Sequence, residues 1–268
     1  VWSTDLIQKD TLAHQSAKWE KELFDVTRPE EKKDLDRLEE LYIKYHFKNS
    51  FVTIGKIDIN QGPLLLRRDG RMKPFVYKGL WSELGMLKHH TFNVGWIYGV
   101  SHRGMTEWFS LKEAIGMLNN GHQPNGQPAH YHETTHTKGM LVLGYRGQLK
   151  NFKIQFWDHY LHQMFNTSWL KIDYEGKILL AGIQYVNQFA DAYQRKLAYT
   201  ERIFQPGATS NTLSVQLGAK VGNSGVKISG AYLRGMGGGE RFVYPKVLSR
   251  ENFYVSQPRS WIDGFGRV

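Results

Sequence analysis

Cysteine is absent from this chain. Without a thiol, the protein cannot use cysteine as a nucleophile, form a disulfide or build a cysteine-type zinc site. The absence suits a protein of the cell envelope, where free thiols would be oxidised in pairs.

Long apolar runs are absent as well. A helix that crosses a membrane needs roughly 18 consecutive apolar residues, and no run in this chain approaches that length. The chain is therefore not a helical membrane protein. A barrel strand needs only about 9 to 11 residues, with an apolar side chain at every second position, so a membrane protein built from strands stays possible.

Blocks of like charge are missing although the chain carries a net charge of +10. Its lysines and arginines are scattered among aromatic and apolar residues, and no nucleic-acid-binding module is recognisable. We therefore expect no nucleic acid partner. An anionic membrane surface or anionic solutes remain as partners for the positive charge.

From Leu41 onward, two sets of residues alternate along the chain with a period of two. Residues 1–40 are highly charged and have Pro29 as their one strong breaker, which predicts a polar loop or extension with some helical tendency. After them, one set of residues alternates with another, and alternation places the two sets on opposite faces of a strand. The first set is Leu41, Ile43, Tyr45 and Phe47, and the second is Tyr42, Lys44 and His46. In a barrel the first set would face lipid.

Ten segments carry a strand pattern of this kind. They are residues 41–47, 51–59, 79–87, 91–100, 139–150, 152–161, 168–174, 178–189, 212–221 and 225–234. Short turns alternate with longer connections, and the longest, residues 101–138, is expected to be a long loop holding one short helix over residues 106–118.

This order, together with 13% aromatic residues, several of them near strand ends, is typical of bacterial outer-membrane barrels. We predict one all-β domain over residues 1–268, an antiparallel transmembrane β-barrel. A soluble β-sandwich is the alternative.

One stretch matches a zinc-protease motif by its letters. His132-Glu133-Thr134-Thr135-His136 reads H-E-x-x-H, which in zinc proteases places two imidazoles one turn apart on a helix. Three features argue against such a site. The two x positions are β-branched threonines, a strand pattern begins at Gly139, and no third ligand is evident. His130, His132 and His136 remain weak metal candidates, with a zinc hydrolase as an alternative function. We expect a solvated loop, no cofactor and no enzyme activity.

A family resemblance rests on more specific residues. The segment Asp69-Gly70-Arg71-Met72-Lys73-Pro74, followed by Gly79, resembles the D-x-R-x-x-P-x-x-x-x-G element of OprD-family outer-membrane porins, in the form of Bacteroidetes-like members. Residues 106–126 and 199–211 resemble later family segments in the same order. Residues 244–266 resemble the pattern P-R-x-x-G-R-E-x-F-Y followed by R-x-x-x-D-G-x-G, with Lys246 in place of an arginine and Ser249 in place of a glycine.

The resemblance implies an eighteen-stranded barrel, so we expect this barrel to be incomplete at both ends. It implies a passive channel in the bacterial outer membrane for small polar solutes. The expected solutes are those that carry a carboxylate, as in the family. Basic residues guide such solutes in the family, which makes Arg67, Arg68, Arg71 and Lys73 pore-lining candidates, with Asp69 orienting Arg71. Lys44, Lys56 and Arg250 are weaker candidates for charges that face the lumen.

The expected partners are outer-membrane lipid and small anionic or zwitterionic solutes, with the protein a monomer or a homotrimer. A non-conducting adhesin or structural barrel is a further alternative.

Overall fold

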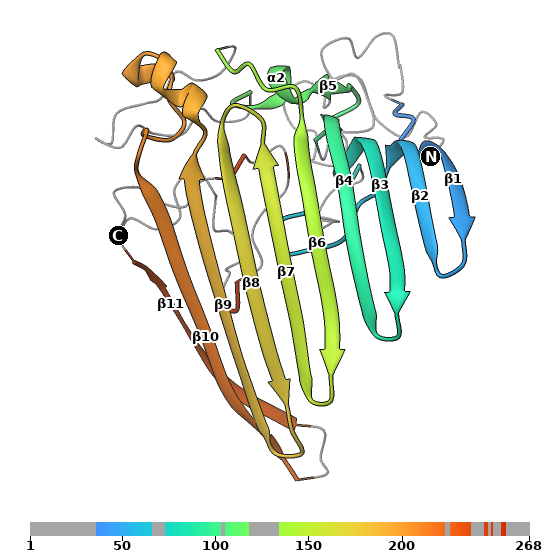
Figure 1. Ribbon diagram of the computed structural model, residues 1–268, viewed down its shortest axis with the longest axis vertical. Coiled ribbons are helices and arrows are strands. Elements are labelled where there is room, and N and C mark those ends of the chain that lie inside the picture. The colour runs from blue at the N-terminus through green and yellow to red at the C-terminus, as the bar shows by residue number, and fades with distance from the viewer. Residues whose placement is uncertain are drawn as a thin grey trace, which may run out of the picture.

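The computed structural model describes residues 36–65, 73–102, 105–117, 134–222, 226–236, 244–245, 248 and 253–255. Within these ranges all the strands belong to one antiparallel sheet, in the order β1-β2-β3-β4-β6-β7-β8-β9-β10-β11, and the short β5 pairs with β4 (Figure 1). The predicted all-β antiparallel fold is confirmed. In the described part, β1 pairs only with β2 and β11 only with β10, so the sheet is open there.

The strands are β1 (Leu41–Phe47), β2 (Ser50–Ile57), β3 (Val76–Leu87), β4 (His90–Ser101), β5 (Phe109–Ser110), β6 (Met140–Leu149), β7 (Phe152–Leu161), β8 (Phe165–Glu175), β9 (Leu179–Ala190), β10 (Thr209–Val221) and β11 (Val226–Gly235). The helices are α2 (Leu111–Ala114) and the 3-10 helices η3 (Ala192–Lys196) and η4 (Tyr199–Glu201). No helix in the described ranges is long and apolar enough to cross a membrane.

The long connections lie at one end of the sheet, where the three-residue connection between β7 and β8 also lies. Two-residue turns join β1 to β2, β3 to β4 and β6 to β7, all at the lower end in Figure 1. The connection that holds β5 and α2, and the one that holds η3 and η4, lie at the upper end. We call these the short-turn end and the long-connection end.

Several predicted boundaries were wrong by a few residues. The strands β3, β8 and β10 each begin three residues before the predicted start. In β8 and β10 this is because polar residues join the hydrogen-bonded ladder: Asn166 pairs with Tyr160, and Ser210 with Gln188. The helix predicted over residues 106–118 is a single turn. Ser110 caps it in a capping box with Glu113, and Gly116, at φ 89°, follows the last turn.

The two faces of the sheet differ in composition. Cross-strand partners share a face, and one row of partners runs from Ile43 through Ile54 and Leu80 to Trp96 and Leu141. Ile43 is 76% exposed and Ile54 is 53% exposed, so the described chain leaves this part of the face uncovered. Leu41, Ile43, Tyr45 and Phe47 lie on it together, as their alternation predicts.

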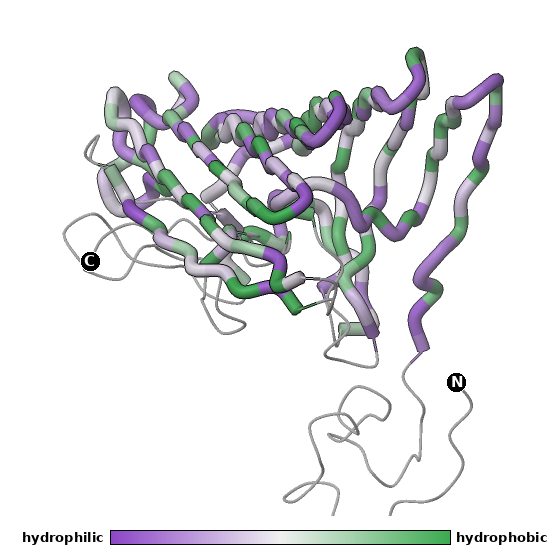
Figure 2. Tube along the Cα trace, turned by 90° about the horizontal axis from the view of Figure 1, so that it is seen from below, coloured by the Kyte–Doolittle hydropathy of each residue, from purple (hydrophilic) through white to green (hydrophobic). Residues whose placement is uncertain are grey.

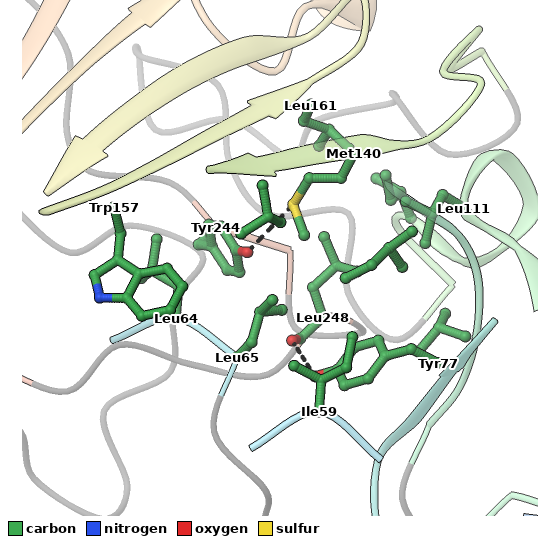
Figure 3. Close-up of a cluster of buried hydrophobic side chains, with 14 of the residues drawn as sticks. Ile59, Leu64, Leu65, Tyr77, Leu111, Met140, Trp157, Leu161, Tyr244 and Leu248 are labelled. Atoms are coloured by element: carbon green, nitrogen blue, oxygen red, sulfur yellow. Dashed lines mark hydrogen bonds between the residues drawn. The ribbon is translucent and has the colours of Figure 1, made fainter. Parts of the chain in front are cut away.

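The other face is concave and largely covered. Figure 2 shows the sheet bent into a trough, and the connecting segments enter it. Side chains of the sheet, Trp157 and Leu161 among them, pack there against Leu64 and Leu65, which follow β2, and against Leu111 of α2 (Figure 3). The long connections therefore fold inward and build an apolar core against the concave face.

Residues that follow β11 complete this core. The Tyr77 hydroxyl donates to the Leu248 carbonyl at 2.9 Å, and the Tyr244 hydroxyl donates to Met140 Sδ at 3.4 Å (Figure 3). The Tyr244 oxygen also lies 3.0 Å from Nδ1 of His159, which is fully buried. Burial raises the pKa of Tyr244 well above its ordinary value, so this phenol stays protonated and able to donate.

Two glycines make room for the largest side chain of the core. The Trp157 indole lies across Gly144 of the neighbouring strand, where an added Cβ would lie 2.6 Å from the indole Cε3. Gly62, at φ 78°, approaches the same indole from the segment after β2. A side chain at either position would displace the ring, so both glycines hold the inward segment close to the sheet.

We predict that Gly144→Val destabilises the protein. The added methyl groups would overlap the Trp157 ring, and overpacking of this kind costs about 1–3 kcal/mol. Thermal unfolding of the full-length gene product, refolded in detergent, should show a lower midpoint. The control is Gly230→Val, since nothing lies within 4 Å of a Cβ at that position. Equal midpoints for the two variants would contradict the proposed slot.

Candidate functional site

The concave face turns from apolar to polar toward the short-turn end. Trp157 and Trp169 are direct cross-strand partners within the core. Two residues closer to the short turns, the next row on the same face runs through Arg146, Gln155, Lys171, Gln184 and Ser214. Two cations and two amides thus lie side by side directly below the apolar core.

Arg146 belongs to a hydrogen-bonded group that reaches across to β3. Its guanidinium forms an ion pair of 2.8 Å with Glu83. Gln61 donates to the same carboxylate at 2.9 Å and accepts from Asn93 at 3.0 Å and from Arg146 at 3.3 Å. Because Gln61 follows β2, this group ties an inward-folded segment to three strands of the wall.

Lys171 belongs to a second group, which holds a residue that follows β11. Its ammonium lies 3.3 Å from a carboxylate oxygen of Asp173 and 4.9 Å from the Tyr254 ring. The Tyr254 hydroxyl donates to Asp173, and its backbone N–H donates to Gln184 at 3.0 Å. Gly182 leaves space for this ring. Burial, with a smaller effect of the Asp173 carboxylate, raises the pKa of Tyr254, which keeps the phenol a donor.

A third group lies at the short-turn end of β8. The Glu175 carboxylate is 3.0 Å from Lys220, 3.3 Å from Lys227 and 3.5 Å from Lys153. Three lysines therefore share one carboxylate, and the group keeps a net positive charge.

Positive charge exceeds negative charge on this face. The cations that the strand register places there are Lys44, Arg146, Lys153, Lys171, Lys220 and Lys227, and the anions are Glu83, Asp173 and Glu175. Among the described strands, the concave face therefore has a positive potential, which attracts small anions from solution.

Most of the predicted site residues lie outside the described residues: Arg67, Arg68, Asp69, Arg71, Arg250, His130 and His132. Lys73 is described and is 7% exposed, immediately before β3. Lys44 lies on the concave face opposite Thr53, and its ammonium is 3.7 Å from the centre of the Phe51 ring. The role of these residues in lining a pore stays a prediction.

Lys56 does not face the lumen as predicted. The register pairs it with Leu41 and Lys78 on the convex face, two residues from Ile54. Its ammonium lies 5.0 Å from the Trp108 ring, near the long-connection end. Lys44 and Lys56 lie on different strands, so the register in which these strands pair determines which face of the sheet each lysine occupies. The sequence alone does not give that register.

Arg146, Lys153, Lys171, Lys220 and Lys227 were missed as candidates. The signal that could have found them is the alternation used for residues 41–47, because Lys153 and Gln155 alternate with Phe152, Ile154 and Phe156. A charged residue between two large apolar residues in a barrel strand is expected to face the lumen.

The described half of the H-E-x-x-H stretch is not helical. Thr134 lies in a turn, residues 135–139 have no regular structure, and β6 begins at Met140. The His136 ring packs edge-on against Tyr193, with 5.7 Å between the ring centres. Among the described residues, no group of three His, Cys, Asp or Glu side chains could hold a metal ion. The helix that a zinc protease needs does not form over this half.

An antiparallel sheet with an apolar convex face, a charged concave face and inward-folded connections at one end has the architecture of an outer-membrane porin. No protein-family model and no curated protein sequence matches the chain. Solved structures do match it, and among them are porins of the OprD and Occ group.

OpdO from Pseudomonas aeruginosa has a TM-score of 0.59 and 11% identity, with 83% of this chain and 53% of that chain covered. OpdK from Pseudomonas aeruginosa, solved with vanillate, has a TM-score of 0.54 and 17% identity over 73% of this chain and 46% of that chain. OccAB3 from Acinetobacter baumannii has a TM-score of 0.54 and 16% identity over 72% and 44%.

The chain thus spans about half the length of the solved porins it matches. Over that part it has their fold, which confirms at the level of structure the resemblance seen in the sequence.

We predict a small but measurable coupling between Glu83 and Arg146. Both side chains are partly exposed, so a double-mutant cycle with alanine should give about 0.2–1 kcal/mol in denaturant unfolding. The control cycle is Lys153 with Glu175, a longer and more exposed pair, for which we expect a smaller value. A coupling energy of zero for Glu83 and Arg146 would show that this ion pair does not stabilise the fold.

Proposed function

We propose that the chain forms part of a passive channel in the bacterial outer membrane, for small polar solutes and especially those that carry a carboxylate. The observation that supports this most directly is the division of one sheet into an apolar convex face and a concave face with excess positive charge. No chemical step is part of this function.

The convex face fits a lipid environment. Aromatic side chains lie on it in two bands, as in the girdles of barrels at the two membrane interfaces. Trp96, Tyr160 and Phe189 belong to one row near the long-connection end, and Phe92, Phe152 and Tyr174 lie nearer the short turns. Aliphatic residues such as Val94 and Leu143, which pair across β4 and β6, lie between the bands and are exposed, at 37% and 41%.

The concave face fits the lining of an aqueous pore. A polar solute crosses the hydrocarbon region only where water and compensating charges replace its hydration. The groups around Glu83, Lys171 and Glu175 supply such charges on strands held rigid by the ladder. The inward-folded segments narrow the lumen toward the long-connection end, which in bacterial barrels is the extracellular end.

Three arguments favour carboxylates. The net positive charge of the concave face attracts anions, and the sequence resemblance adds Arg67, Arg68, Arg71 and Lys73 as further basic candidates. The similar porin OpdK was solved with vanillate, which is an aromatic carboxylate. The proposed partners are outer-membrane lipid and small anionic or zwitterionic solutes, with the channel a monomer or a homotrimer.

Planar-bilayer recording of the full-length gene product tests the proposal. Under a salt gradient, we expect a reversal potential that favours anions and a conductance that added vanillate reduces. Arg71→Gln should weaken the block if this arginine lines the pore. A folded barrel that does not conduct would overturn the proposal in favour of an adhesin or a structural barrel.

We predict that Glu175→Gln increases the preference for anions. The substitution removes the one carboxylate shared by three lysines, so the reversal potential should shift further toward that of the anion. The matched control is Asp158→Asn, which also removes one negative charge but lies on the convex face, opposite Leu143 and Ser168. Equal shifts in both variants would show that the concave face does not line the conducting path.

A further inference from the structure

A fully buried arginine lies in the segment that precedes β1. The sequence predicts a polar, charged extension over residues 1–40, yet the Arg37 side chain is 0% exposed. Arginine is almost never buried to this extent unless its guanidinium is paired and hydrogen-bonded. The partners of Arg37 therefore show what this side chain holds together.

One nitrogen of the guanidinium holds the turn that follows β4. Nη1 of Arg37 donates to Ser101 Oγ at 3.0 Å, to the His102 carbonyl at 3.1 Å and to the Met105 carbonyl at 3.0 Å. The Met105 N–H also donates to the His102 carbonyl, at 3.1 Å. Ser101 is the last residue of β4, so the chain reverses its direction at this guanidinium.

The other nitrogen joins this turn to two further segments. Nη2 of Arg37 donates to the Glu39 carboxylate and to the Pro74 carbonyl, both at 2.7 Å. The carboxylate offsets the charge of the buried guanidinium. Pro74 lies just before β3. One side chain thus connects the segment before β1, the segment before β3 and the connection that follows β4.

The elements to which this turn leads are too short to hold their own position. β5 pairs with β4 over two residue pairs, and α2 is four residues long. Neither a ladder of two pairs nor a single helical turn is stable alone. Leu111 of α2 is nevertheless 1% exposed and packs in the core of the concave face (Figure 3). Contacts with the rest of the protein therefore place α2, and the Arg37 hydrogen bonds fix where the chain turns toward it.

We propose that Arg37 is a positioning residue for the channel. By holding the turn after β4, it keeps α2 inside the lumen and so sets the width of the pore at the long-connection end. Without the guanidinium, the buried Ser101 hydroxyl and the Pro74 carbonyl lose a charged donor. The proposal rests on the proposed function in one respect, because the width of the lumen acts on a solute only if the protein conducts.

Limited proteolysis of the full-length gene product in detergent tests the position of α2. Trypsin cleaves after lysine, and Lys112 lies on α2 whereas Lys171 lies within β8. We expect Arg37→Met to speed cleavage after Lys112 by about tenfold or more, because losing hydrogen bonds to a charged group shifts a local opening equilibrium by such a factor. Cleavage after Lys171 requires the sheet to unfold, so its rate should stay that of the wild type.

Further variants separate positioning from general stability. Arg37→Lys keeps the charge but lacks the planar fork, so its cleavage after Lys112 should be intermediate. Ser101→Ala removes one acceptor and should speed that cleavage about fivefold, which gives a test even if Arg37→Met does not fold. The control is Arg234→Met, which removes an exposed arginine from β11. Unchanged cleavage after Lys112, or an equal increase after Lys171, would overturn the proposal.

Planar-bilayer recording tests the consequence for the pore. Arg37→Met should increase the single-channel conductance and abolish the block by vanillate, whereas Arg234→Met should change neither. Faster cleavage after Lys112 with an unchanged conductance would overturn the role in pore width. A wild-type protein that does not conduct would overturn the proposed function instead, and proteolysis would still decide whether Arg37 holds α2.

Discussion

The antiparallel hydrogen-bonded ladder is the constraint on which the other features of this structure depend. In a hydrocarbon environment every backbone N–H and C=O needs a partner within the protein, and neighbouring strands provide these partners. Once the ladder is formed, each strand has two faces of fixed composition, because successive side chains point in opposite directions. The division between lipid-facing and lumen-facing residues follows from pairing alone.

The concave face combines two environments that are only one row of residues apart. Trp157 and Trp169 belong to an apolar core that the inward-folded segments cover, whereas Arg146 and Lys171 lie in the adjacent row. Gln61 and Tyr254 join the two environments, since each comes from an inward segment and bonds to a charged group on the wall. The core therefore fixes the position of segments whose neutral polar residues then hold the charged side chains of the concave face in place.

Strand alternation explains why much of the fold could be predicted from the sequence. It gave all ten long strands and the shared face of Leu41 and Ile43, because these depend on neighbours in the chain. The face of Lys56 and the slot for Trp157 depend on register and on contacts between segments far apart, so no local pattern contains them. The pore-lining role of Arg71 was predicted by resemblance alone, and this residue lies outside the described residues.

The charged groups of the concave face can hold a solute only weakly. Lysines that share Glu175, and Arg146 with Glu83, already have protein partners, so an anion gains little by replacing them. Such groups set a potential without trapping the solute, which suits conduction because a solute must also leave. A wall of paired charges can therefore attract many anions without retaining any of them for long.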